Sequence, residues 1–260
     1  MSRIGAAIAQ ASHKALIAYV TVGHPSTDTT LEVVPALVEG GCDIVELGIP
    51  FSDPLSDGAT IQRASHHALE QGVTPQSCLD IAATLRQTLD VPLVFMSYYN
   101  PLLRYGLEPF CAACSEAGVD GLIVPDLPPE EGTELEGLAQ SHELDLIYLL
   151  TPTSTEQRIR LVASRSRGFV YAVSLKGTTG ARNDLPADLE AFLAKLKSIA
   201  LQPVCVGFGV ATPQQAQRVA AAADGVIIGS RIMEIVESSD QPATAARAFI
   251  QGIRQAISHD

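Results

Sequence analysis

Residues 45–62 read Val-Glu-Leu-Gly-Ile-Pro-Phe-Ser-Asp-Pro-Leu-Ser-Asp-Gly-Ala-Thr-Ile-Gln, so a short apolar run leads directly into a polar loop. The run holds one carboxylate, Glu46, and burying an unpaired charge there would cost several kcal/mol, so this residue needs a functional reason. Asp57 follows eleven positions later in a segment with two prolines and a glycine, which is typical of a shaped loop. The stretch therefore predicts one dry and one wetter carboxyl, whose pKa values differ as acid–base chemistry requires.

Short apolar runs recur along the whole chain, and helical patterns separate them. Eight runs cover residues 15–22, 44–47, 93–96, 121–124, 144–150, 169–174, 204–207 and 225–228. Near-continuous apolar strands that alternate with amphipathic helices indicate parallel strands buried on both faces. The length of 260 residues matches a barrel of about 250 residues. We therefore predict an α/β fold in which residues 1–260 form a single (β/α)8 TIM-barrel domain with an extra N-terminal helix at residues 2–10.

The helical patterns have recognisable starts, such as Ser26 and Thr27, which can cap the first long helix. They cover residues 29–39, 61–71, 76–89, 109–117, 130–141, 155–165, 185–199, 213–222, 232–238 and 244–258. A doubly wound open sheet is the alternative architecture. It would call for a G-x-G-x-x-G motif after the first strand, where the chain reads Val22-Gly23-His24-Pro25.

Composition narrows the classes of partner. The chain is 47% hydrophobic, which allows a sizeable core, and its formal charge of −12 argues against nucleic acid or an anionic membrane as a partner. No apolar stretch reaches the roughly 18 residues of a membrane span, and the start lacks a basic region followed by a hydrophobic signal core. We expect a cytoplasmic protein with no nucleic-acid or membrane partner.

The cysteines and paired histidines do not indicate a metal site. Five cysteines are an odd number in a chain too large to need disulfides, which favours reduced thiols. Cys111 and Cys114 form a C-x-x-C motif, but neither a second cysteine pair nor a histidine at zinc-ligand spacing accompanies it. The adjacent His66 and His67 point to different sides of a helix. We expect the two cysteines to be small core residues on one helical face.

Glycine-bearing loops follow the last three strands, at residues 177–180, 207–209 and 229–230. In barrels of this kind a phosphate is often held by the loops after strands seven and eight and by a helix N-terminus. Gly209 and Gly229 allow a close approach to backbone amides, and Ser230 offers an amide and a hydroxyl. The alternative is that the glycines only mark strand ends. The pattern predicts a phosphate site that needs no cluster of lysines.

Together these motifs closely resemble the α subunit of tryptophan synthase, across nearly the whole chain. The resemblance rests on spaced motifs that occur in the family's order: residues 46–54, Asp57-Gly58, Tyr98-Tyr99-Asn100-Pro101, Pro125-Asp126-Leu127-Pro128, Thr179-Gly180, Gly207-Phe208-Gly209 and Gly229-Ser230. It implies a lyase of tryptophan biosynthesis that cleaves indole-3-glycerol phosphate to indole and glyceraldehyde 3-phosphate by a retro-aldol reaction. It also implies no cofactor in this chain and pyridoxal phosphate only in a partner β subunit.

The resemblance names Glu46 and Asp57 as the catalytic pair, and the chemistry suits them. The bond between ring and side chain breaks readily only after ring carbon 3 is protonated, so a general acid must lie against the ring. A carboxyl raised in pKa, such as Glu46, fits that role and can then take the side-chain hydroxyl proton. An ionised Asp57 can stabilise the positive ring N–H.

By the same resemblance, a mostly apolar slot holds the flat indole ring. The substrate-binding residues implied are Tyr19, Met96, Tyr98, Ile123, Leu150 and Tyr171 around the ring and glycerol, Thr179 and Gly180 on a loop at residues 176–185, and Gly209, Gly229 and Ser230 at the phosphate. The family's loop closes over the site, with Thr179 hydrogen-bonded to Asp57. Closure would exclude water.

The loops around Asp53-Pro54 and Tyr98 to Pro101 follow strands two and three, so they rim the active-site end of the barrel. The resemblance implies that they dock a tryptophan synthase β subunit in an α2β2 heterotetramer. Three positions depart from the family pattern: His24, Ala59 and Thr178. Two alternative functions remain open from sequence, another phosphate-binding barrel enzyme such as a phosphosugar epimerase or isomerase, and a non-catalytic barrel that activates a partner.

Overall fold

The computed structural model describes residues 2–11, 13–173, 189–207 and 209–258, and its centre is a parallel nine-stranded sheet. The strands are β1 (Ala15–Thr21), β2 (Ile44–Gly48), β3 (Leu93–Met96), β4 (Gly121–Ile123), β5 (Asp145–Ile147), β6 (Leu149–Leu150), β7 (Val170–Val173), β8 (Val204–Gly207) and β9 (Gly225–Ile228). Their order is β5-β4-β3-β2-β1-β9-β8-β7-β6. Because Tyr148 alone separates β5 from β6, the two ends of the sheet meet and the barrel closes.

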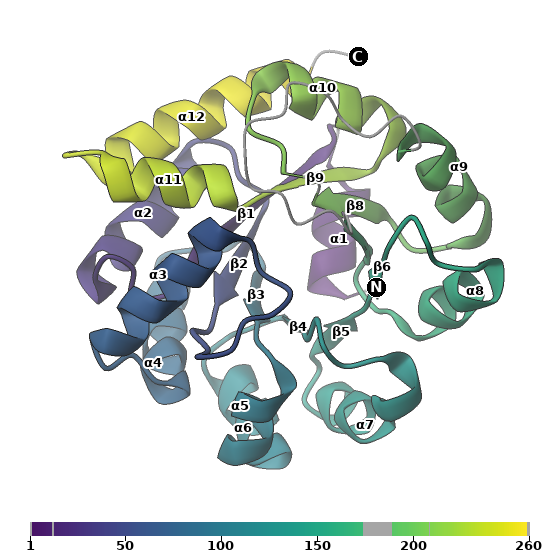
Figure 1. Cartoon of the computed structure of the whole chain (residues 1–260), viewed down its shortest axis with the longest axis horizontal. Helices are drawn as coiled ribbons and strands as arrows, with labels where there is room; N and C mark the ends of the chain where they lie inside the picture. The colour runs from purple at the N-terminus through teal and green to yellow at the C-terminus, as the bar shows by residue number, and fades with distance from the viewer. Residues whose placement is uncertain (1, 12, 174–188, 208, 259–260) are drawn as a thin grey trace.

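The predicted barrel is therefore confirmed, with its fifth strand split in two. Figure 1 looks down the barrel, and the helices form a ring around the strands. They are α1 (Arg3–Ala9), α2 (Thr27–Glu39), α3 (Ala59–Glu70), α4 (Pro75–Arg86), α5 (Tyr99–Tyr105), α6 (Leu107–Glu116), the 3-10 turn η1 (Pro129–Glu131), α7 (Thr133–Ser141), α8 (Glu156–Arg165), α9 (Leu189–Ile199), α10 (Pro213–Ala222), α11 (Ser230–Ser238) and α12 (Pro242–Ile257).

Hydroxyl caps start several of these helices where the sequence indicates. The Ser26 side chain accepts a hydrogen bond from the Thr29 amide at 3.0 Å, and Thr74 forms a capping box with Ser77 just before Pro75. The short helix α5 is a correction, because the sequence reading treats Tyr98 to Pro101 as loop only. Pro101 occupies its first turn, where no intrahelical amide bond is lost, so the proline is tolerated there.

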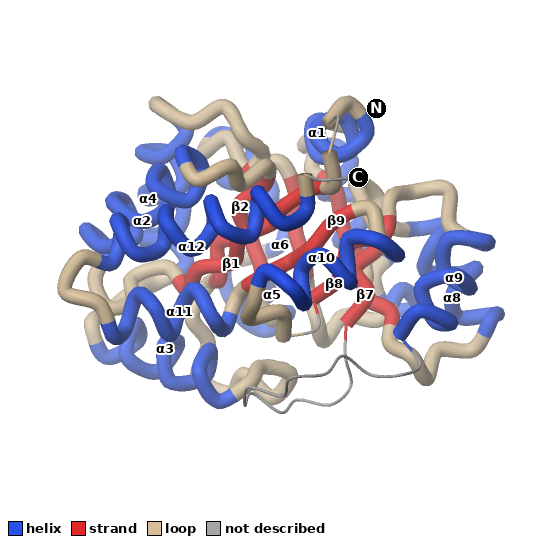
Figure 2. Tube along the Cα trace, turned by 90° about the horizontal axis from the view of Figure 1, so that it is seen from above, coloured by secondary structure: helices blue, strands red, loops and turns tan. Residues whose placement is uncertain are grey.

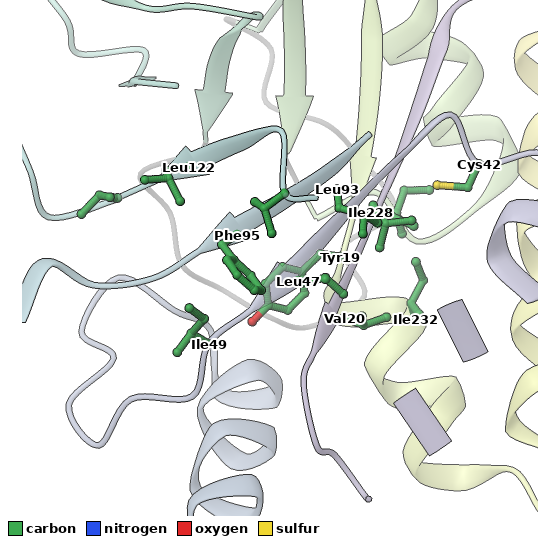
Figure 3. Packing of buried hydrophobic residues seen from close by; sticks show 14 of the residues in the cluster. Tyr19, Val20, Cys42, Leu47, Ile49, Leu93, Phe95, Leu122, Ile228 and Ile232 are labelled. Atoms are coloured by element: carbon green, nitrogen blue, oxygen red, sulfur yellow. The ribbon is translucent and has the colours of Figure 1, made fainter. Parts of the chain in front are cut away.

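Two apolar layers position the functional end of the barrel. The inner layer consists mainly of alternate strand residues that face the barrel interior. Its members are Ile4, Ile8, Ala15, Ile17, Ile44, Val94, Ile123, Ile147, Phe169, Tyr171, Cys205 and Ile227. Ile4 and Ile8 come from α1, which closes one end of the barrel opposite the loops that follow the strands (Figure 2). The other layer, between barrel and helices, includes Leu47 and Phe95 (Figure 3). Since Ile44 faces inward, Glu46 two positions later does too.

Candidate active site

Glu46 is the carboxyl at the centre of the barrel. It lies on β2 between Tyr19 of β1 and Val94 of β3. Its side chain is fully buried, and neither carboxyl oxygen has a hydrogen-bond partner among the described residues. Burial raises the pKa of Glu46 to about 8. The group is therefore mostly protonated at neutral pH, which is the state that a general acid needs.

Asp57 lies in the loop between β2 and α3, and it is half-buried. Burial raises the pKa of this carboxyl to about 6, while a hydrogen bond with Tyr98 opposes that rise. The expected order of the two carboxyls is confirmed, since Asp57 has the lower pKa. Asp57 is wetter than the fully buried Glu46, as expected, but it is not a freely exposed loop carboxyl, because it is half-buried and hydrogen-bonded with Tyr98. Asp57 is still mostly ionised at pH 7.

Tyr19 and Tyr171 lie near both carboxyls. Burial first, and then the charges of Glu46 and Asp57, hold the pKa of each tyrosine well above its usual range. Tyr19 also shares a hydrogen bond of 3.2 Å with the Thr21 hydroxyl, a contact that sequence reasoning missed. Because both carboxyls act on the pKa of both phenols, the four groups lie close together at the barrel mouth.

Two strand glycines make room for these tyrosines. A Cβ on Gly48 would lie 2.1 Å from the Tyr19 hydroxyl oxygen, and a Cβ on Gly207 would lie 2.6 Å from that of Tyr171. Side chains at these positions would therefore displace the aromatic rings. The space that Tyr171 needs therefore explains why a glycine occupies position 207, whether or not a phosphate binds there.

Two further predicted pocket residues face the interior, and one does not. Ile123 belongs to the inner cluster, and Met96 packs against it. Leu150 and its register partner on β7, Ala172, both pack in the cluster under the helices, so the structure does not bring Leu150 together with the other predicted pocket residues. Its neighbour Leu149, which pairs with Tyr171 of β7, packs against the inner cluster instead. The period of two from Ile147 would have identified Leu149.

Two of the predicted phosphate residues, Gly229 and Ser230, lie at the start of α11. Gly229 is the N-cap of this helix, and because glycine has no side chain, no side-chain cap occupies the first helix amides. Ser230 is the first helical residue, and Gly209 has a positive φ of 68°. Thr179, Gly180 and the departure Thr178 lie outside the described residues, as does Phe208. The helix start supplies the amides and dipole that bind an anion.

Comparison with known proteins identifies the family. A family model described as "Tryptophan synthase alpha chain" matches residues 6–257. The tryptophan synthase alpha chain of Dehalococcoides mccartyi is 52% identical over 257 residues, covering 99% of this chain and 100% of the relative. That of Geobacter sulfurreducens is 47% identical, with 99% of each chain covered.

Solved structures agree with the sequence relatives. A crystal structure of the alpha chain from Legionella pneumophila has a TM-score of 0.91 at 35% identity, covering 99% of this chain and 97% of that one. A structure of Mycobacterium tuberculosis tryptophan synthase has a TM-score of 0.93 at 36% identity, covering 100% and 99%. This chain belongs to the tryptophan synthase alpha chain family.

The chain is accordingly a lyase of tryptophan biosynthesis whose reaction is the retro-aldol cleavage of indole-3-glycerol phosphate to indole and glyceraldehyde 3-phosphate. Of its departures from the family pattern, Ala59 begins α3, and His24 is buried with its ring 5.0 Å from that of His67. Neither contributes a group to the space around Glu46.

Other expectations concern metals and membranes. Cys111 and Cys114 are free thiols buried in the core on α6, so the prediction of small core residues on one helix is confirmed. In the described part of the chain, no group of three or more His, Cys, Asp or Glu side chains could hold a metal ion. No helix within the described ranges is long and apolar enough to cross a membrane.

Proposed function

We propose that Glu46 and Asp57 together perform the cleavage. The observation that supports this is the pair of raised pKa values, about 8 for Glu46 and about 6 for Asp57, in two carboxyls that both act on Tyr19 and Tyr171. The neutral Glu46 carboxyl protonates ring carbon 3, and the Asp57 carboxylate stabilises the positive ring N–H that results. Glu46, now ionised, takes the hydroxyl proton of the side chain. The carbon–carbon bond then breaks, and its electrons return to the ring, releasing indole and the aldehyde.

Two substitutions test this assignment. Glu46→Gln and Asp57→Asn keep shape but remove the proton or the charge, and each is expected to lower indole release by about 10²–10⁴-fold. Indole release by the purified chain is the measurement. Glu70→Gln, on the exposed side of α3, is the matched control and should retain normal turnover. Near-normal turnover in either test variant would overturn the assignment.

For substrate binding, we propose that the α11 start holds the phosphate and that Tyr19, Met96, Ile123 and Tyr171 surround the indole. The uncapped helix start and the inward positions of these side chains support this. Thr179 and Gly180 remain proposals that rest on the family resemblance. We further propose that residues 1–260 act as one domain in the cytoplasm. The pairing of β1 with β9 and the free cysteines are compatible with that view.

The proposed partner is a tryptophan synthase β subunit, which would carry pyridoxal phosphate and form an α2β2 heterotetramer with this chain. Solved structures that are similar to this chain are titled tryptophan synthase of Mycobacterium tuberculosis, without restriction to the alpha chain. Two large apolar side chains are exposed on the expected surface, Leu55 at 83% in the Asp53-Pro54 loop and Leu103 at 49% on α5. Beside them lies a hollow of about 460 Å³ whose lining includes Phe51, Asn100 and Pro101. Exposed apolar patches of this kind mark interfaces.

The surface suggests a matched pair of variants. Leu55→Asp should weaken co-elution with the cognate β subunit and reduce its activation of indole release, because a charge replaces a buried contact. Leu201→Asp changes another highly exposed leucine, 99% accessible, in the segment between α9 and β8, and should alter neither the co-elution nor the activation. Asp53→Ala should weaken activation more than basal cleavage. If the unmodified subunits neither co-elute nor change indole release, the chain is better described as a stand-alone lyase.

A further inference from the structure

Tyr98 links two loops at the barrel mouth. It follows β3 and precedes α5, and only 6% of its surface is exposed. The Ser56 amide donates a hydrogen bond to the Tyr98 hydroxyl oxygen at 2.9 Å. The same hydroxyl lies close enough to the Asp57 carboxyl to lower its pKa as a hydrogen-bond donor. One phenol therefore contacts two consecutive residues of the loop that carries the proposed catalytic carboxylate.

The direction of these bonds follows from the protons available. The Tyr98 oxygen accepts from the Ser56 amide, so the single hydroxyl hydrogen is left for Asp57. Burial first, and then the Asp57 charge, raise the pKa of Tyr98 above its usual range, so the phenol remains a donor throughout the working pH range. Donation to the ionised form of a carboxyl stabilises that form. Tyr98 thus opposes the burial that raises the pKa of Asp57.

The Tyr98 ring is itself held in place. It packs on Phe51, with ring centroids 5.2 Å apart and planes inclined by 32°. The next amide, that of Tyr99, donates to the Asp126 carboxylate at 2.9 Å, which ties the start of α5 to the loop after β4. Across the described residues, the hydrogen bonds from residues 50–58 to another strand's loop all end on Tyr98. The tyrosine is therefore a fixed support for a loop that is otherwise largely exposed.

We infer that Tyr98 is a positioning residue for Asp57, whose hydroxyl holds the β2–α3 loop in place and keeps the Asp57 carboxylate ionised. This rests on the proposed catalytic role of Asp57. It differs from the expectation that Tyr98 binds substrate directly, because here Tyr98 acts through the carboxylate. Its loss should change the pH dependence of the reaction and the turnover, with little change in substrate affinity.

The test uses Tyr98→Phe, which retains the ring against Phe51 and removes the hydroxyl. Since Asp57 must be ionised, loss of its donor should move the acid limb of the kcat/KM profile to higher pH. The alkaline limb, set by the Glu46 proton, should not move. At neutral pH kcat should fall by about ten- to a hundredfold, the size expected for one hydrogen bond to a charged group, with KM nearly unchanged.

Tyr105→Phe is the matched control. Its hydroxyl donates to the Gln76 side chain at 2.8 Å, away from Asp57, so both limbs of its profile should match those of the unmodified protein. In the Asp57→Asn background, Tyr98→Phe should cause little further loss of turnover, because the residue acts through Asp57. An unmoved acid limb, or a raised KM with unchanged kcat, would overturn the inference. If Asp57→Asn itself turns over normally, the proposed function fails instead.

Discussion

Asp43 immediately precedes β2 and Glu46 lies at the middle of that strand, three residues later, and the two carboxyls have opposite surroundings. Asp43 accepts a hydrogen bond from the Leu16 amide at 2.7 Å and pairs with Arg254 of α12. Glu46 has no partner in the described part of the chain. A satisfied carboxylate at the closed end supports the fold, whereas an unsatisfied carboxyl in the middle of the strand costs stability and is available for chemistry.

The pattern at the closed end repeats around the barrel. Asp120 precedes β4 and accepts from the Leu93 amide of β3 at 2.8 Å, and Asp224 precedes β9 and accepts from the Val204 amide of β8 at 2.9 Å. Each also pairs with a cation, Arg86 and Lys197 respectively, at 2.7 Å. These three aspartates thus join neighbouring strands, whereas Glu46 has no such partner among the described residues.

The comparison is tested most strongly by the pH dependence of stability after Glu46→Gln. The folded protein holds the Glu46 proton up to about pH 8, whereas the unfolded chain releases it near 4.5. Between these values the unfolded state gains from ionisation, so the wild type loses stability as pH rises and the variant does not. The difference in unfolding free energy should grow by on the order of 3–5 kcal/mol between pH 4.5 and 8.

Urea unfolding at a series of pH values measures this difference. Asp57→Asn is the internal comparison, since its smaller rise in pKa confines the effect to the window from 3.8 to about 6. A constant offset between wild type and Glu46→Gln across the whole range would mean that Glu46 is ionised in the folded protein, and it could not then serve as the acid.

The closed end predicts the reverse behaviour. Asp43→Asn should lower the unfolding free energy at pH 7 by about 2–3 kcal/mol, because it removes the negative charge that pairs with the mostly buried Arg254 guanidinium. Indole release per folded molecule should stay normal. The control is Asp90→Asn, since Asp90 pairs with Arg3 but is fully exposed, so its stability should not change measurably. Equal effects in the two variants would remove the proposed distinction between the ends.

The sequence anticipated the barrel well, and the reasons for its failures are local. Eight apolar runs were enough to specify the strands, because buried parallel strands need no alternation. That same continuity hid the register of residues 144–150, so Leu150 was chosen where Leu149 faces inward. Pro101 concealed α5, since a proline reads as a break even in a first turn.

The candidate site was predictable in part. Glu46 could be recognised because an acidic residue inside an apolar strand is costly anywhere. The burial of Asp57 could not be predicted from the sequence, because it depends on Tyr98, which is 41 positions away in another loop. Contacts that join separate βα loops leave no periodic trace in the sequence.

The smallest expected effect concerns the proposed phosphate site at the start of α11, where the helix amides would take the place of a cation. Ser230→Asp puts a carboxylate at the first helical position, where the helix dipole favours negative charge, so the fold should be unaffected or slightly more stable. The same charge repels the substrate's phosphate and should raise KM roughly tenfold, about 1.4 kcal/mol.

Ser238→Asp adds the same charge at the other end of α11. That position lies about 12 Å away by helix rise, which is more than the Debye length, so salt screens its effect on the phosphate. Steady-state kinetics and thermal melts on both variants distinguish the cases. A normal KM for Ser230→Asp would place the phosphate elsewhere, and a raised KM in both variants would mean that net charge, not the helix start, governs binding.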